Sequence, residues 1–176
     1  MCLELLTTGG PGSLAGYEVL HDPPALLRWV AASRLPGEPR LSVDDAGVAD
    51  ARTLRNALWG MAAAAAHDGD TDPADVSVVN AAAAAPALVP RIGADGSRQW
   101  LPGATAGQLL STVARDAVDL FTGPYAHRVR ECGSHDCRLV FVDTSRPGRR
   151  RWCAMERCGN RSKVRAHRAR HVEADR

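Results

Sequence analysis

Apolar residues recur at intervals of three and four along much of the first two thirds of the chain, which is the spacing of helices that bury one face. The longest such pattern opens at Ser42 and Asp44 and runs to His67. Its apolar stripe comprises Val48, Ala51, Leu54, Leu58, Met61 and Ala62. We expect this stripe to pack on a core and Arg52 and Arg55 to face elsewhere.

Further helices are predicted where a capping residue precedes an apolar pattern. Asp22 should cap a helix that ends near Pro36, and Asp72 should cap one over residues 73–88. A third is expected over 105–123, with Leu109, Leu110, Val113, Val118 and Leu120 available for burial. Short apolar runs on either side of Asp95-Gly96 predict a β-hairpin within 87–101. The opening 20 residues, two short runs around a glycine-rich turn, suggest two strands or a strand and a loop.

Length and composition agree with one globular, mainly α-helical unit followed by a smaller appendix. The chain has 176 residues, of which 45% are hydrophobic. No apolar run approaches the length of a membrane span, and no secretory leader is visible. We therefore expect a cytoplasmic protein. The boundary is predicted near residue 122, giving units 1–122 and 123–176.

Charge divides the chain in the same way. Residues 1–127 contain eight basic and fourteen acidic side chains, and residues 128–176 contain fourteen basic and six acidic ones. The formal charges are therefore about −6 and +8, which sum to the net +2 of the whole chain. A segment as basic as the second one should bind a polyanion or an acidic partner.

Four of the five cysteines lie in this basic part. Cys132, Cys137, Cys153 and Cys158 form two C-x4-C pairs separated by fifteen residues. In a reducing compartment, two such pairs favour a tetrahedral site for one Zn²⁺ ion over disulfides or a redox switch, which remain the alternatives. His135 is expected in a solvent-facing loop, and Cys2 as a small buried hydrophobe.

The segment between the two pairs predicts a hairpin over the metal. Residues 139–142 are apolar, residues 143–148 form the turn, and residues 149–152 return, with Phe141 and Trp152 as a miniature core. After the last cysteine, Gly159 is expected in a turn conformation and Asn160 as the N-cap of a basic helix. The expected phosphate-binding residues are Arg149, Arg150, Arg151, Arg161, Lys163, Arg165, Arg168 and Arg170.

The acidic part contains no recognisable catalytic grouping. His21 and His67 lie beside acidic residues in predicted turns and are expected at the surface. No serine lies in a G-x-S-x-G motif, and the carboxylates are scattered as helix caps or solvated groups. We therefore do not expect an enzyme.

The residues 131–170 closely resemble the CGNR zinc finger, whose name matches Cys158, Gly159, Asn160 and Arg161. The likeness includes the F-x-D-x-S segment at Phe141, Asp143 and Ser145. In that family the finger usually follows a helical domain called ABATE, in proteins proposed to be stress-related transcription regulators. "CLELLTT" at residues 2–8 is similar to the family opening C-L-D-F-V-N-T, with Glu4 for the aspartate and Thr7 for the asparagine.

Together these features predict a zinc-dependent DNA-binding regulator, in which the finger grips phosphates and the helical domain dimerises or senses an effector. RNA is an alternative target, because phosphate contacts alone do not distinguish it from DNA. Two further hypotheses remain open. The finger could be a zinc-stabilised module that docks on an acidic protein partner, or its thiolates could form a redox sensor.

Overall fold

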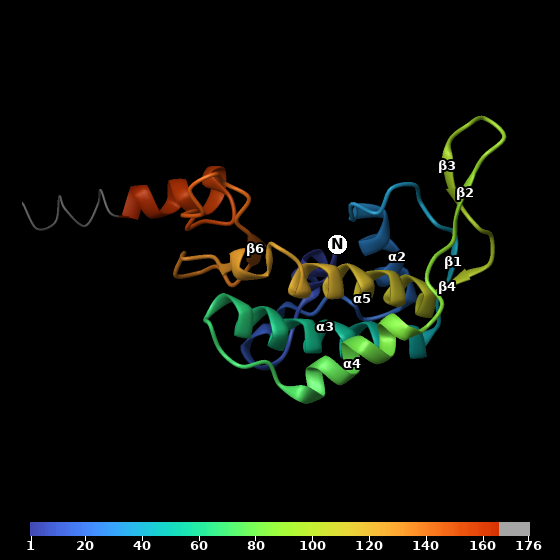
Figure 1. The fold of residues 1–176 in the computed structure, drawn as a ribbon, viewed down its shortest axis with the longest axis horizontal. Coiled ribbons are helices and arrows are strands. Elements are labelled where there is room, and N and C mark those ends of the chain that lie inside the picture. The colour runs from blue at the N-terminus through green and yellow to red at the C-terminus, as the bar shows by residue number, and fades with distance from the viewer. Residues whose placement is uncertain (166–176) are drawn as a thin grey trace, which may run out of the picture.

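The computed structural model describes residues 1–165. Four longer helices form the body of the molecule, and a small cysteine-rich unit and a hairpin lie at its opposite ends (Figure 1). The longer helices are α2 (Pro23–Ala32), α3 (Asp45–Ala66), α4 (Pro73–Ala84) and α5 (Ala106–Thr122). The short elements of the N-terminal part are α1 (Cys2–Leu5), η1 (Leu6–Thr8), η2 (Gly12–Tyr17), β1 (Leu41–Ser42), β2 (Pro90–Ile92), β3 (Arg98–Trp100) and β4 (Ala104–Thr105). The cysteine-rich unit contains η3 (Ala126–Arg128), β5 (Val129–Glu131), β6 (Val140–Val142) and η4 (Met155–Gly159).

Side chains at the predicted positions cap the helices. Asp22, Asp44 and Asp72 each accept a backbone N–H of the first turn at 2.8 Å. Thr105 and Gln108 form a capping box that starts α5. The long predicted helices are confirmed, although α2 ends at Ala32 and not near Pro36, and α4 ends at Ala84 and not at residue 88. None of the helices within residues 1–165 is long and apolar enough to cross a bilayer.

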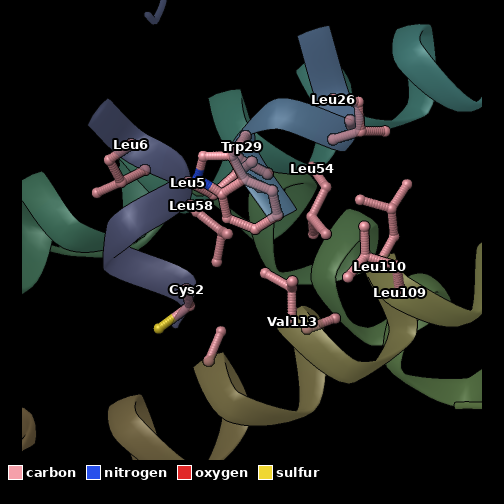
Figure 2. Packing of buried hydrophobic residues seen from close by; sticks show 14 of the residues in the cluster. Cys2, Leu5, Leu6, Leu26, Trp29, Leu54, Leu58, Leu109, Leu110 and Val113 are labelled. Carbon is pink, nitrogen blue, oxygen red and sulfur yellow. The ribbon is translucent and has the colours of Figure 1, made fainter. Parts of the chain in front are cut away.

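The main core lies where α1, α2, α3 and α5 meet (Figure 2). Leu54 and Leu58 of α3 and Leu109 and Val113 of α5 are at most 1% exposed, and Trp29 of α2 packs among them. The helix α4 packs against both α3 and α5. Predicted apolar stripes on α3 and α5 therefore do face the core.

The opening segment is helical, so the predicted strands are wrong. Cys2, Leu5 and Leu6 lie on α1 and η1 with at most 2% of their surfaces exposed. Their spacing of three and four brings all three onto one face of a helical turn, where they cover the core. A run this short has no hydrophobic periodicity that distinguishes a helix from a strand. Its conformation is therefore determined by contacts with the rest of the fold.

The two polar residues of this opening motif act locally. Glu4 forms an ion pair with Arg34 at 2.9 Å and also accepts the Arg34 backbone N–H at 3.1 Å. The Thr7 hydroxyl donates to the Glu4 carbonyl at 2.8 Å. The Glu4 contacts fasten the first helical turns to the chain that follows α2, and the Thr7 bond lies within those turns.

Arg55 is buried, which contradicts the expectation that it faces away from the core. Only 2% of this residue is exposed, and its two terminal nitrogens donate to the two carboxylate oxygens of Glu18 at 2.8 Å. It also donates to the Thr8 carbonyl at 3.2 Å. The arginine therefore holds the loop around η2 across α3. Trp59, one turn later, reinforces this loop by donating its indole N–H to the Gly9 carbonyl at 2.8 Å.

The hairpin around Asp95-Gly96 forms as predicted. Strands β2 and β3 pair antiparallel, with Arg91 opposite Gln99, and Gly96 takes a left-handed φ of 77°. This hairpin projects from the helices at the end farthest from the cysteine-rich unit (Figure 1). A second small pair, β1 and β4, is parallel and leads into α5.

The cysteine-rich unit is packed onto the helical one. Val129 of β5 is fully buried and Val140 of β6 is 8% exposed, and both belong to the main hydrophobic cluster. At the edge of this contact, His67 Nε2 lies 2.8 Å from Glu131 Oε2. His67 is at the surface as expected, but it joins the two units.

Candidate metal centre

The four cysteines of the basic part converge on one point. Their sulfur atoms all lie within 4.8 Å of one another. The Cys137 and Cys153 sulfurs are 3.7 Å apart, and those of Cys153 and Cys158 are 3.5 Å apart. All four are free thiols, with Cys132 and Cys158 buried and the other two half-buried. His135 is exposed and lies outside this group.

This arrangement fits a single zinc ion. Four thiolates placed tetrahedrally at about 2.3 Å from Zn²⁺ have their sulfurs about 3.8 Å apart. The two separations given above are close to that value, and none exceeds 4.8 Å, so shifts of about 1 Å or less would complete the coordination. A bound zinc would supply structural cross-linking, because a unit this small cannot bury enough apolar surface to be stable alone.

Backbone hydrogen bonds shape the first cysteine pair. The Cys132 N–H donates to the Leu139 carbonyl at 2.9 Å, and the Cys137 N–H donates to the Ser134 carbonyl at 3.0 Å. Gly133 donates its N–H to the Arg151 carbonyl at 2.8 Å, and the Cys153 N–H points to the Cys132 sulfur at 3.4 Å. The segment leading to the second pair is thereby tied to the first pair.

Of the second pair, Cys153 lies in a bend and Cys158 lies on a helix that starts earlier than predicted. A wide helical turn, η4, begins at Met155 and contains Cys158, and helical structure continues through residues 160–165. Asn160 has helical angles (φ −67°, ψ −41°) and is therefore not an N-cap. Gly159 lies within this helical turn and has no positive φ, so the separate turn conformation expected for it is wrong. A Cβ there would lie 2.7 Å from Met155 Sδ, at the end of a flexible side chain, and 3.2 Å from Trp152 Cδ1.

The predicted hairpin has a different partner strand. β6 pairs antiparallel with β5, which precedes the first cysteine, and Arg130 lies opposite Phe141. Residues 149–152 form no strand. The buried faces of β5 and β6 both contribute valines to the large core, which stabilises this pairing. Phe141 and Trp152 remain only half-buried and are each covered by a guanidinium, from Arg150 at 4.8 Å and Arg151 at 5.1 Å.

Asp143 organises the loop that carries the three consecutive arginines. Its buried carboxylate accepts the backbone N–H of Ser145 at 2.9 Å and that of Arg150 at 2.8 Å. The Arg128 guanidinium donates to the Ser145 carbonyl at 2.8 Å. Aspartate two residues before a serine is a turn-forming signal, and here it fixes the whole loop.

Asp136, which no sequence pattern singled out, links the first cysteine pair to the C-terminal helix. Its Oδ2 lies 3.1 Å from Arg161 and 3.0 Å from Arg165. Its Oδ1 accepts the Ser134 hydroxyl at 2.8 Å. Arg161 also approaches the Cys158 sulfur at 3.5 Å. Two of the predicted phosphate-binding arginines therefore already contact the cluster or its carboxylate.

The other predicted cations are distributed around the cluster. Arg149, Arg151 and Lys163 are exposed, and their side chains form no ion pair or hydrogen bond with residues 1–165. Arg150 is also exposed, but its guanidinium donates to the carbonyls of Trp152 (2.8 Å) and Cys153. Arg168 and Arg170 lie outside the described residues.

The arginine beside Cys158 also affects its acidity. Burial raises the pKa of this thiol, but hydrogen bonds from Arg161 and from the neighbouring cysteines outweigh burial and bring the pKa down to about 7. Burial and the adjacent sulfurs raise the pKa of the Cys153 thiol. Since zinc binds thiolates, its uptake would release protons.

Comparison with known families agrees with this geometry. Residues 1–124 match the ABATE model, described as "Putative stress-induced transcription regulator", and residues 128–171 match the CGNR zinc finger. No curated protein matches the chain. Neither family description is that of an enzyme. Because the first match covers more than half of the chain and the second covers the sulfur cluster, this chain belongs to the ABATE family and carries a CGNR zinc finger.

Proposed function

We propose that the protein is a zinc-dependent DNA-binding transcription regulator that grips phosphates through its basic finger. The observation that carries the proposal is the set of exposed cations around the sulfur cluster. Arg149, Arg151 and Lys163 have no anionic partner within residues 1–165, although the molecule is rich in carboxylates. Exposed cations that have no counter-charge among these residues can neutralise the phosphates of a nucleic-acid backbone.

The metal would act by fixing the positions of the segments that carry these cations. Asp143 fixes the loop that bears Arg149 and Arg151, and Asp136 fixes the helix that bears Lys163. Both carboxylates belong to segments that a zinc ion bound by the four clustered sulfurs would hold together. Loss of zinc would separate the two basic segments, so DNA affinity should depend on the metal as well as on charge.

The test is the salt dependence of affinity for duplex DNA. If Arg149, Arg151 and Lys163 each neutralise one phosphate, the logarithm of the association constant should fall with that of salt with a slope of about −3. A flat response, or no binding by the zinc-loaded protein at low salt, would refute the proposal. Chelation should abolish binding.

A matched pair of double variants separates a specific surface from general charge. Replacing Arg149 and Arg151 with alanine should weaken binding about tenfold or more and reduce the slope by about two. Replacing Arg91 and Arg98 with alanine removes the same charge from the hairpin at the far end of the molecule and should change little. Equal losses in both variants would indicate non-specific attraction.

One observation favours a second candidate function, docking of the finger on a protein. Its strands β5 and β6 already bury Val129 and Val140 against the helical domain. If intramolecular docking were the whole role of the finger, the protein would have no measurable affinity for DNA or RNA at low salt. The same titration, repeated with single-stranded RNA, distinguishes these possibilities.

A further inference from the structure

A pocket of about 380 Å³ lies between the helical domain and the finger, next to the sulfur cluster. We propose that it binds a small planar aromatic molecule that carries one acidic group. Its volume is within the range of small-molecule sites, and a boundary between two domains is a frequent place for one. Neither family description assigns a ligand to this pocket.

The wall from the helical domain is aromatic and apolar. Tyr17 and Trp59 line it together with Leu6 and Leu14. Tyr17 is 72% exposed, which is a large exposed fraction for an aromatic side chain. Its ring is therefore available to a ligand. The Trp59 ring is held in place by its hydrogen bond to Gly9, so its orientation is fixed before any ligand arrives. Such a wall offers stacking contacts to a flat ring.

The wall from the finger is cationic. It contains Arg138, Arg157 and Arg161, with Asp136 as the one carboxylate. Arg161 is already paired with Asp136 and lies beside the Cys158 sulfur. Arg138 has a longer, exposed ion pair with Glu131 at 3.4 Å. The side chain of Arg157 forms no ion pair or hydrogen bond within the described part of the chain, so it is the cation available to a ligand acid.

These two walls together define the ligand class. A planar ring can stack on Tyr17 and Trp59, and a carboxylate or a similar acid can form an ion pair with Arg157. Three cysteines, Cys137, Cys153 and Cys158, also line the pocket. A ligand here would therefore touch the helical domain and the zinc-binding segments at once, and its binding and that of zinc should strengthen each other.

The experiment is calorimetric titration of the zinc-loaded full chain, without DNA, using naphthoate as the probe. We expect a Kd of about 1 mM or tighter. Two analogues test the contributions of the two walls separately. Naphthamide keeps the aromatic ring without the charge, and cyclohexanecarboxylate keeps the charge without the aromatic ring. Both should bind at least about fivefold more weakly than naphthoate.

The chain provides matched variants for each wall. Tyr17→Ala should weaken naphthoate binding roughly 3- to 10-fold, and Arg157→Ala about tenfold. Tyr125→Ala and Arg146→Ala remove the same residue types from exposed positions outside the pocket and should leave binding unchanged. All four side chains are largely exposed, so each variant should fold, which circular dichroism and zinc content would verify.

The proposal is overturned if naphthoate does not bind at millimolar concentration, or if the Tyr125 and Arg146 variants lose as much affinity as those of Tyr17 and Arg157. Equal affinity for all three probes would also overturn it. Because no nucleic acid is present, these outcomes are independent of DNA binding. A protein that binds naphthoate but not DNA would keep this site and refute the regulator proposal.

Discussion

Each clustered cysteine supplies a quarter of the proposed zinc coordination. Cys158→Ser should lower the zinc content of the purified protein from about one ion per chain to nearly none, because a serine hydroxyl is a poor substitute for a thiolate. Elemental analysis after dialysis measures this change.

Cys2→Ser is the matched control, since this fifth thiol is also buried but lies on α1 in the helical core, far from the cluster in the chain. It should lose some stability and retain its zinc. Full zinc occupancy in the Cys158 variant, or equal zinc loss in both variants, would contradict the assignment.

The pair of Arg55 and Glu18 should make stability depend on pH. Burial raises the Glu18 pKa, but hydrogen bonds from Arg55 and the Leu20 N–H outweigh it and hold the pKa below its usual 4.5. A carboxyl with a depressed folded pKa stabilises the fold above its unfolded pKa, and this contribution is lost as the pH falls through the folded value. The stability of the protein should therefore fall as the pH drops below about 4.5.

Glu18→Gln tests this prediction. At neutral pH it should reduce the free energy of unfolding by about 2–3 kcal/mol, because Arg55 would remain buried without its counter-charge. The difference from the original protein should shrink below pH 4.5. Glu38→Gln, at an exposed glutamate with no ion pair among residues 1–165, should leave the denaturation curves unchanged. A constant difference at every pH would refute the linkage.

The sequence contained little sign of this pair. Arg55 stands between apolar positions on α3, but its partner is 37 residues earlier, in a segment with no predicted helix. Arginines on amphipathic helices are usually solvated, so pattern alone favours the surface. By contrast, the four metal-binding cysteines could be predicted because their spacing is itself the chemical requirement.

At the level of elements, two glycines should respond oppositely to alanine. A Cβ at Gly47 of α3 would lie 2.6 Å from the Cβ of Ala106, at the start of α5, and neither group can move without its helix. Gly47→Ala should therefore reduce the free energy of unfolding by roughly 1–3 kcal/mol.

Gly107 is one residue farther along α5, and its nearest neighbour to a new Cβ is the Thr105 hydroxyl at 3.8 Å. Gly107→Ala should raise the free energy of unfolding by about 0.5–1 kcal/mol, because alanine loses less backbone entropy in a helix. Urea denaturation of both variants measures the contrast. Similar values for the two would show that the helices do not approach closely at Gly47.

Helices that have both a capping residue and a long stretch of apolar residues at helical spacing could be predicted, whereas the short elements could not. The capping residues Asp44 and Thr105 mark the starts of α3 and α5 in the local sequence. The strand β6 is three residues long, and two flanking segments could have paired with it. The choice of β5 depends on burying Val129 against a helix more than sixty residues earlier in the chain, which no local pattern encodes.

For the molecule as a whole, zinc should stabilise the helical domain as well as the finger. Val129 and Val140 belong to the shared core, so loosening the finger would withdraw them from it. We expect chelation to lower the melting temperature of the helical signal in far-UV circular dichroism. Val129→Ala should give a related loss of about 1–3 kcal/mol with zinc retained. A helical transition that is unchanged by chelation would show that the two units are independent.

The burial of Val129 and Val140 also bears on how the chain acquires its structure during synthesis. Domains made first on the ribosome usually fold before later ones emerge. Here the last valine of the common core is at position 140 of 176, so about four fifths of the polypeptide must be made before the first domain can close. Until then we expect the nascent helices to expose the apolar surface that these two valines cover in the finished protein.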